Sequence, residues 1–248
     1  MSRNCVSLKG KLVFVMGGGK FGTRALRYLK AKGAKVLVVD VNLGCNANSE
    51  VDVQTTEFSV LDSLDEWKAA FLVGDAVDLL AALLETKVPD MVVTAIPGNA
   101  VAKVVEGWFM KRGIKLEPYL EVIPKVLENI PESLVLFVDY VWGVMVVSYM
   151  PFNMRCKENC IPQKDVCTST GRPKIASIDK LLKFCVYDLT DVSGILCSLQ
   201  LTGALGAIDG KELYSLLKRL ENLHIPYTFA IGTACNCNGI LKLTKAKK

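Results

Sequence analysis

The chain has 248 residues, enough for one large domain or two small ones. Hydrophobic residues make up 51% of it and charged residues 22%, which excludes a disordered or fibrous protein. One histidine stands against nine cysteines, so there is almost no material for a Ser–His–Asp triad or a site of several imidazole ligands, whereas thiolate chemistry stays open.

The net charge of +5 comes mostly from the C-terminal end, which carries Lys242, Lys245, Lys247 and Lys248. Without these lysines the chain is nearly neutral, so we expect no nucleic-acid binding. A short basic end of this kind is usually a solvated tail. The first apolar run is too short for a secretory signal, which favours a cytoplasmic protein with reduced thiols.

The first half of the chain alternates short apolar runs with amphipathic stretches. This pattern predicts buried strands and helices of a parallel sheet with right-handed crossovers. We expect strands at 11–16, 35–40 and 91–96, and helices at 20–32, 75–86 and 100–111. Residues 42–59 are expected to be a loop with at most a short strand, and 65–72 are ambiguous.

A strongly apolar run of 17 residues, 134–150, follows a shorter predicted helix at 121–129. It is shorter than the roughly 20 residues that a membrane-spanning helix needs. Its Val, Phe, Tyr and Trp content is typical of strands. We therefore predict two buried strands and no membrane span.

The composition changes at Pro151, where an irregular stretch runs to Pro173 without periodicity. Order is expected again at 179–184, then a strand at 195–199, a Gly-rich connection at 201–210, a helix at 211–222 and a strand at 226–231. Asp209 and Glu212 form a capping-box-like start for that last helix. The predicted fold is α/β: a doubly wound, parallel Rossmann-like sheet in residues 1–150, and a smaller C-terminal α/β region with a Cys-rich loop in residues 151–248.

The first predicted strand leads into a glycine-rich turn of the pattern G-x-G-x-x-G, formed by Gly17, Gly19 and Gly22. In this fingerprint the glycines permit a tight turn, close approach of a pyrophosphate, and close packing of helix on strand. The N–H groups near Lys20 and Phe21, at the helix N-terminus, would hold the phosphates. Asp40 ends the second strand, where an acid binds ribose hydroxyls and repels a 2′-phosphate, so NAD is predicted over NADP.

Four segments extend this pattern: GGGKFG, VLVVD ending at Asp40, VGDAVD at 73–78 and MVVTAI at 91–96. Residues 1–115 resemble the TrkA N-terminal (RCK) type of Rossmann domain, which occurs in regulators of potassium conductance. The resemblance implies that Asp75 lies near the adenine of the bound dinucleotide. Asp75 is also expected to cap the helix that starts at Ala76, and the two roles are compatible.

Three cysteines of the irregular stretch, Cys156, Cys160 and Cys167, have the spacing C-x₃-C-x₆-C, and Cys235 and Cys237 follow the last predicted strand. Parallel strands place their following loops at one sheet edge, which would bring the two groups together. Four thiolates satisfy a 4Fe–4S cluster or a zinc ion. An iron–sulfur cluster is favoured, zinc is the second choice and free thiols are the third; Cys197 is an alternative fourth ligand.

Two functions fit these sites. One is an NAD-dependent oxidoreductase or electron-transfer protein with a thiolate-ligated centre. The other is a non-enzymatic NAD-binding sensor or regulatory subunit, in which the cysteines form a structural metal site or a redox switch. Both leave room for a redox or regulatory protein partner and for a homodimer, and neither identifies a catalytic residue.

Overall fold

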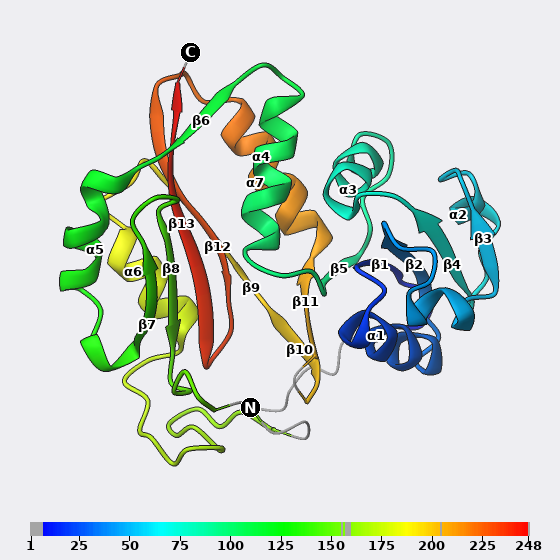
Figure 1. Cartoon of the computed structure of the whole chain (residues 1–248), viewed down its shortest axis with the longest axis horizontal. Helices are drawn as coiled ribbons and strands as arrows, with labels where there is room; N and C mark the ends of the chain where they lie inside the picture. Colours follow the sequence, from blue (N-terminus) through cyan, green and yellow to red (C-terminus); the bar gives the residue numbers. More distant parts are fainter. Residues whose placement is uncertain (1–6, 155, 157–159, 204, 248) are drawn as a thin grey trace. The chain divides into compact units, whose positions relative to one another are not determined.

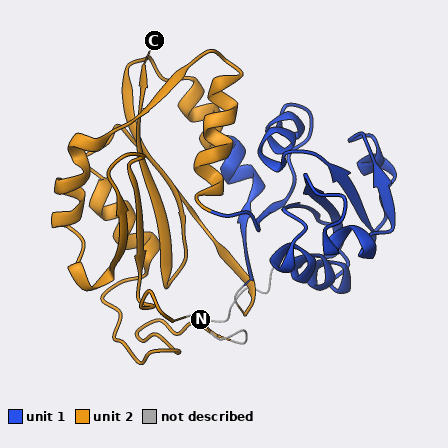
Figure 2. Ribbon diagram, viewed as in Figure 1, with its two compact units in different colours: residues 1–97, 205–214 blue, residues 98–204, 215–248 orange. Residues whose placement is uncertain are grey.

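The computed structural model describes residues 7–154, 156, 160–203 and 205–247, and it shows an α/β chain with two mixed sheets (Figure 1). The chain divides into two compact units (Figure 2). The first comprises residues 1–97 and 205–214, and the second comprises residues 98–204 and 215–248. Residue 150, where the composition changes, therefore lies inside the second unit.

The first sheet has the strand order β10-β11-β5-β1-β2-β4-β3. Neighbouring strands from β5 to β3 run parallel, whereas β11 pairs antiparallel with β5. The expectation that residues 201–210 form a Gly-rich connection was wrong, because most of these residues belong to β10 and β11. The strands are β1 Leu12–Met16, β2 Lys35–Asp40, β3 Val53–Thr55, β4 Ala69–Val73, β5 Met91–Thr94, β10 Leu199–Thr202 and β11 Leu205–Asp209.

Two helices, α1 (Lys20–Ala31) and α3 (Ala76–Leu84), cover opposite faces of this sheet (Figure 1). Helix α1 packs through a stripe of small and apolar residues and stops before Gly33, whose φ of +80° favours glycine. Both helices lie where the periodicity predicts them. The loop expected at 42–59 contains a 3₁₀ turn at Asn46–Glu50 and β3, and a one-turn helix, α2 (Val60–Ser63), precedes β4.

The second sheet has the order β7-β8-β13-β12-β9, with β6 also paired to β13. All its pairs are antiparallel except β9 with β12. The run at 134–150 forms two strands, β7 and β8, as predicted, but β7 is not buried and Phe137 on it is 50% exposed. No helix in the described part of the chain is long and apolar enough to cross a membrane. The strands are β6 Lys115–Pro118, β7 Val135–Asp139, β8 Val144–Ser148, β9 Val192–Cys197, β12 Tyr227–Ala234 and β13 Asn238–Lys247.

The C-terminal lysines do not form a solvated tail, contrary to the expectation from charge. They lie on β13, which pairs with strands on both of its sides. Lys242 pairs with Glu106, Lys245 with Glu121 and Lys247 with Glu117. Lysine stems can cover apolar surface while the ammonium groups stay at the edge, so a strand rich in lysine still fits a folded sheet. Lys248 lies outside the described residues.

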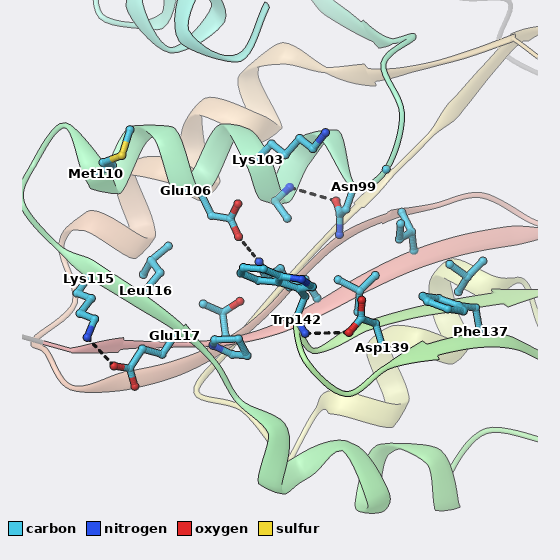
Figure 3. A pocket seen from close by; sticks show the side chains of 18 of the residues that line it. Asn99, Lys103, Glu106, Met110, Lys115, Leu116, Glu117, Phe137, Asp139 and Trp142 are labelled. Carbon is cyan, nitrogen blue, oxygen red and sulfur yellow. Dashed lines mark hydrogen bonds and ion pairs between the residues drawn. The ribbon is translucent and has the colours of Figure 1, made fainter.

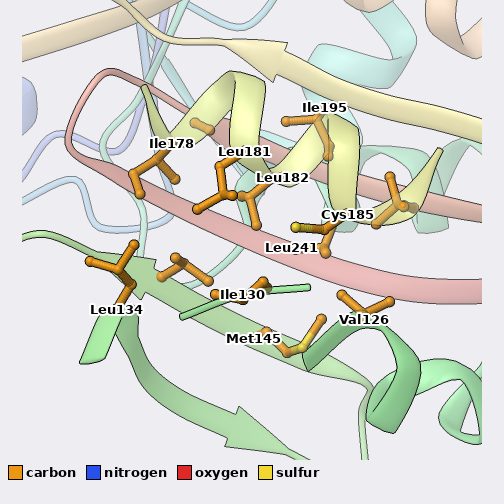
Figure 4. Packing of buried hydrophobic residues seen from close by; sticks show 14 of the residues in the cluster. Val126, Ile130, Leu134, Met145, Ile178, Leu181, Leu182, Cys185, Ile195 and Leu241 are labelled. Atoms are coloured by element: carbon orange, nitrogen blue, oxygen red, sulfur yellow. The ribbon is translucent and has the colours of Figure 1, made fainter. Parts of the chain in front are cut away.

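One face of the second sheet packs against α5 (Ile123–Glu128) and α6 (Ile178–Val186) (Figure 4). Leu241 and Met145 on the sheet and Leu182 on α6 are fully buried there. Helices α4 (Ala100–Met110) and α7 (Gly210–Glu221) are joined by an ion pair between Arg112, just after α4, and Glu221. The Asp209 carboxylate accepts hydrogen bonds from the N–H groups of Lys211 and Glu212, so the predicted cap of α7 is confirmed.

Candidate functional site

The turn between β1 and α1 has the close backbone approaches that its glycines predict. Gly17 has a φ of +94°, and its N–H donates to the Val39 carbonyl at 2.7 Å, which ties the turn to β2. A Cβ at Gly22 would lie 1.8 Å from the carbonyl oxygen of Gly17. Only a residue without a side chain fits at position 22, because the helix packs directly on the turn.

The two middle glycines have different surroundings. A Cβ at Gly19 would meet nothing within 4 Å, so the space beside it is open. A Cβ at Gly18 would lie 2.4 Å from the sulfur of Cys45. The motif did not assign a role to Gly18. The uninterrupted run of three glycines was the only signal for it, because Cys45 lies 27 residues further along the chain.

The N-terminus of α1 is open to solvent. Gly19 is its N-cap, no side chain caps it, and its first turn contains no acidic residue. Lys20 and Phe21 are both exposed. The Thr23 hydroxyl donates to the carbonyl oxygens of Gly18 and Gly19, at 3.1 and 2.9 Å, and so fixes the turn from the helix side. The free N–H groups of a first helical turn are positive and suit an anion.

Asp40 lies at the end of β2, opposite the glycine turn. One carboxylate oxygen accepts from the Gly18 N–H at 2.6 Å, and the other accepts from the Asn42 N–H at 2.8 Å. Each carboxylate oxygen has a second lone pair, so the group retains capacity to accept further hydrogen bonds. Val41 and Leu43, just beyond it, are 69% and 58% exposed. Strand β2 thus ends in an acid, Asp40, and exposed apolar residues come just after it.

Asp75 is the N-cap of α3. Its carboxylate accepts from the N–H groups of Val77 and Asp78, at 2.8 and 3.1 Å. The Gly74 N–H donates to the Asp40 carbonyl at 3.0 Å, which joins the ends of β2 and β4. The capping role is therefore confirmed. Strand β4 lies beside β2, so Asp75, just after β4, is next to the end of the strand that finishes at Asp40.

The turn between β12 and β13 lies beside the irregular stretch that carries the other cysteines. The Cys237 carbonyl accepts from the Tyr149 N–H at 3.0 Å. Asn238 favours the thiolate of Cys156 and Lys174 favours that of Cys237, which partly offsets the effect of burial on the two pKa values. Cys197, the last residue of β9, pairs in register with Ala234, next to Cys235.

The five predicted thiols interact with one another electrostatically. Burial raises the pKa of Cys156, and the charges of Cys160, Cys237 and Cys167 raise it further. Burial also raises the pKa of Cys237, and the charges of Cys235 and Cys167 raise it further. Cys156, Cys160 and Cys167 are thus close enough to Cys235 and Cys237 for their charges to interact. We call these five residues the thiol cluster.

Cys167 differs from the rest of the thiol cluster. Burial raises its pKa, but the Thr170 hydroxyl and the N–H groups of Thr170 and Ser169, helped by Lys174, outweigh burial and lower it. A thiol with a lowered pKa forms its thiolate more readily. Cys185, outside the cluster, is buried in the core beside α5, and its pKa is raised to about 11. Cys5 lies outside the described residues.

In its chemistry the thiol cluster suits a soft metal, because its donors are sulfur. In its arrangement it does not: among the residues that the structure describes, no three His, Cys, Asp or Glu side chains are grouped so that they could hold a metal ion. The iron–sulfur centre, with zinc as its alternative, therefore remains a prediction from the sequence. No step of chemistry is derived through it below.

Two family models match the chain. One is described as "Uncharacterized protein, N-terminal domain" and matches residues 12–100; the other is described as "Uncharacterized protein, C-terminal domain" and matches residues 84–247. A protein of Archaeoglobus fulgidus, described as "Uncharacterized protein", is 31% identical over 233 residues, which cover 93% of this chain and 98% of that one. The two matched ranges overlap at residues 84–100, which include Pro97, where the chain first passes between its compact units. Neither description refers to regulators of potassium conductance, so that resemblance stays a prediction.

Proposed function

The chain belongs to the family that both matching models describe, AF_1314, and we propose a function for its first unit. This unit binds NAD(H). The observation that carries the proposal is the 1.8 Å approach that a Cβ at Gly22 would make to Gly17. A turn this tight exposes the first N–H groups of α1 beside open space at Gly19. That arrangement suits the pyrophosphate of a dinucleotide, for which the helix dipole and the N–H groups are both favourable.

The strand order supports the same proposal. From β1 the chain adds β2, β3 and β4 on one side and then crosses to β5 on the other side of β1. In a doubly wound sheet, ligands bind at the carboxyl ends of the strands where the order reverses. The glycine turn follows β1 at this point. We therefore propose that β5-β1-β2-β4-β3 is the dinucleotide-binding half of a Rossmann-like sheet, to which β11 adds an antiparallel edge.

Asp40 is proposed to select NAD. It would accept hydrogen bonds from the ribose hydroxyls with its remaining lone pairs, while its charge repels the 2′-phosphate of NADP. The adenine would lie against the apolar surface beyond Asp40, close to Asp75. Lys20 and Phe21 would flank the phosphates through their backbone N–H groups.

We expect Asp40→Asn to weaken NAD binding and to shift the preference between NAD and NADP by about tenfold towards NADP. The asparagine side chain can still accept from the Gly18 N–H, so the turn should keep its shape while the charge is lost. Calorimetric titration of both dinucleotides would measure the shift. Asp78→Asn, which removes a carboxylate from the first turn of α3, is the control. An equal loss for NAD and NADP would contradict the assignment of Asp40.

The thiol cluster is the feature that favours a redox protein over a plain nucleotide-binding domain. Its members come from two distant segments and include Cys167, whose pKa is lowered in spite of its burial. Thiolates are the ligands of iron–sulfur clusters, which transfer electrons, and of structural zinc sites, which do not. On this basis we propose an oxidoreductase or electron-transfer protein. Its substrate would meet the nicotinamide end of the dinucleotide.

Anaerobic purification tests the thiolate centre. An iron–sulfur protein would show broad visible absorbance and would contain iron and sulfide, whereas a zinc protein would be colourless and contain zinc. We expect Cys156→Ser to release the metal, and Cys45→Ala, which lies outside the thiol cluster, to retain it. A preparation without iron or zinc would remove the metal centre from the proposal but leave NAD binding intact.

A sensor of the cofactor's redox state is the second candidate. The observation that favours it is the path of the chain, which passes between the two units three times because residues 205–214 return to the first unit. A change on dinucleotide binding at the first unit would reach the second through three covalent links. A sensor should leave NADH unoxidised in the presence of ferricyanide, whereas a redox protein should consume it.

A further inference from the structure

The second sheet carries apolar side chains on both of its faces. One face, formed by alternate residues such as Met145 and Leu241, is buried against α5 and α6. The alternate residues that point to the opposite face, Val144, Val146 and Ile240, are half-buried. An antiparallel sheet with one solvated face normally has polar residues there, so the composition of this second face is that of a covered surface.

Helix α4 covers only part of this face and leaves a groove of about 700 Å³, whose lining belongs entirely to the second unit (Figure 3). One wall is a stripe of α4 at helical spacing, which includes Ala102, Glu106 and Met110. The floor comes from β6, β7, β8 and β13 and includes the half-buried residues of β8 and β13. The volume lies within the range of small-molecule sites, roughly 300–1,000 Å³, which are lined mainly by apolar side chains.

The charged side chains that line the groove balance one another. They are three lysines and three acids, namely Lys103, Lys115, Lys242, Glu106, Glu117 and Asp139. Glu106 pairs with Lys242, and Glu117 pairs with Lys115 at 3.0 Å and, outside the groove, with Lys247. Lys103 has an interaction of its own. The lining therefore has no net charge, and neither sign is in excess to attract an ion.

The ion pair between Glu106 and Lys242 joins α4 to β13 beside Trp142 (Figure 3). The Lys242 side chain is only 13% exposed, and its Nζ lies 5.8 Å from the centre of the Trp142 ring. The turn that carries this ring is fixed, because the Asp139 carboxylate accepts from the N–H groups of Val141 and Trp142, at 2.8 and 3.0 Å. The indole, the ammonium group and the carboxylate thus partner one another, and a ligand meets a wall whose charges are already compensated.

A lining of this kind suits an uncharged ligand. A carboxylate or ammonium group brought into the groove would lose hydration, and it would have to break an existing ion pair to gain a partner of opposite charge. An apolar molecule instead removes the half-buried residues of β8 and β13 from water, which contributes roughly 25 cal/mol for each Å² of apolar surface. Both effects favour a neutral molecule over an ion of the same shape.

We propose that the groove between α4 and the strands β6, β7, β8 and β13 binds an uncharged, apolar small molecule. Its body lies on Val144, Val146 and Ile240, beside the Glu106–Lys242 pair. That pair keeps charged molecules out, because each partner is occupied by the other. The site shares no residue with the glycine turn of the first unit, so the proposal does not rest on NAD(H) binding.

Fluorescence titration of the full chain with N-phenyl-1-naphthylamine, a neutral probe that brightens in apolar surroundings, tests this proposal. The anionic probe 8-anilinonaphthalene-1-sulfonate has the same ring system with a sulfonate added. We expect the neutral probe to bind about tenfold more tightly than the anionic one. Val146→Phe, which fills the floor of the groove, should weaken the neutral probe about tenfold. Val141→Phe is the matched control, because Val141 is 68% exposed and lies outside the lining.

A second variant tests the role of the ion pair. Glu106→Gln leaves Lys242 without its carboxylate, so the anionic probe should gain about tenfold in affinity while the neutral probe changes by less than about twofold. Glu128→Gln, at an exposed position on α5, changes the net charge of the chain by the same amount and should alter neither affinity.

Three results would overturn the proposal. The first is no binding of the neutral probe, or binding that Val146→Phe leaves unchanged. The second is an anionic probe that binds as tightly as the neutral one before any substitution. The third is a dimer in sedimentation that Val146→Phe dissociates, which would assign this face to a second copy of the chain. Circular dichroism checks the fold of each variant, and the Glu106→Gln comparison still decides the proposal if Val146→Phe unfolds.

Discussion

Gly22→Ala is expected to unfold the first unit and, with it, to abolish dinucleotide binding. The new Cβ would lie 1.8 Å from the Gly17 carbonyl oxygen, and the obstructing atoms belong to the backbone. The helix must move away from β1 to admit a methyl group, which separates α1 from the sheet it covers. Overpacking of this severity costs about 3 kcal/mol or more.

Gly19→Ala is the matched control for Gly22→Ala. A Cβ at Gly19 meets nothing within 4 Å, and its backbone has a φ of −71°, which alanine adopts freely. We expect its free energy of unfolding to stay within about 0.5 kcal/mol of the original, while NAD affinity falls about tenfold because the methyl group takes the space proposed for the pyrophosphate. Urea unfolding followed by the fluorescence of Trp67, in the first unit, measures stability. Equal stability of the two variants would contradict the packing argument, and unchanged NAD affinity in Gly19→Ala would contradict the proposed binding mode.

The parts of the fold that the sequence predicts best are those determined by neighbouring residues. The turn at 17–22, helix α1 and strand β2 follow one another within 30 residues, so local periodicity and the glycines suffice to place them. The need for glycine at position 18 could not be found in this way. It depends on Cys45, which the chain brings back against the turn only after β2 is complete.

The strands that escaped the sequence analysis depend on distant partners. Strand β11 joins β5 from more than 100 residues away, and its residues look like a Gly-rich connection because no local pattern marks their partner. Strand β13 was not predicted, because its lysines made the segment look like a solvated basic tail. The alternation of Leu241 and Leu243 with Lys242 was a usable signal for it, since a two-residue period marks a strand even where every second residue is charged.

The thiol cluster could be predicted only in part from the sequence. The rule that loops after parallel strands share one sheet edge predicts that its cysteines lie near one another, and the charges of these cysteines do interact. The spacing does not determine how the sulfur atoms are arranged, because that depends on the irregular stretch between β8 and α6, in which backbone geometry has no repeating pattern. The groove between α4 and the strands β6, β7, β8 and β13 had no sequence signal, since its lining comes from five separate elements.

The second large effect concerns the end of the chain. We expect a chain truncated after Asn238 to lose the fold of the second unit, although the ten residues removed look like a basic tail. Strand β13 lies between β12 on one side and β8 and β6 on the other, so its loss separates the β12–β9 pair from the β7–β8 pair and leaves β6 without its partner. Leu241, Leu243 and Ala246 are fully buried and would be lost with it. The point variant Leu241→Ala, which removes only part of this core, should cost about 2–5 kcal/mol.

The control for the truncation is the double variant Lys245→Ala, Lys247→Ala, which removes charge from the same segment but keeps the strand. The Glu117 carboxylate has a pKa lowered to about 2 by hydrogen bonds from Lys247 and then Lys115, so Lys115 still partners it when Lys247 is replaced. Exposed ion pairs of this kind contribute little to stability, and the unfolding transition should hardly move. Soluble yield, circular dichroism and limited proteolysis distinguish the two variants. If the truncated chain stays soluble and folded while the double variant does not, the charges of this segment matter more than its pairing, and β13 is not the strand on which the second unit depends.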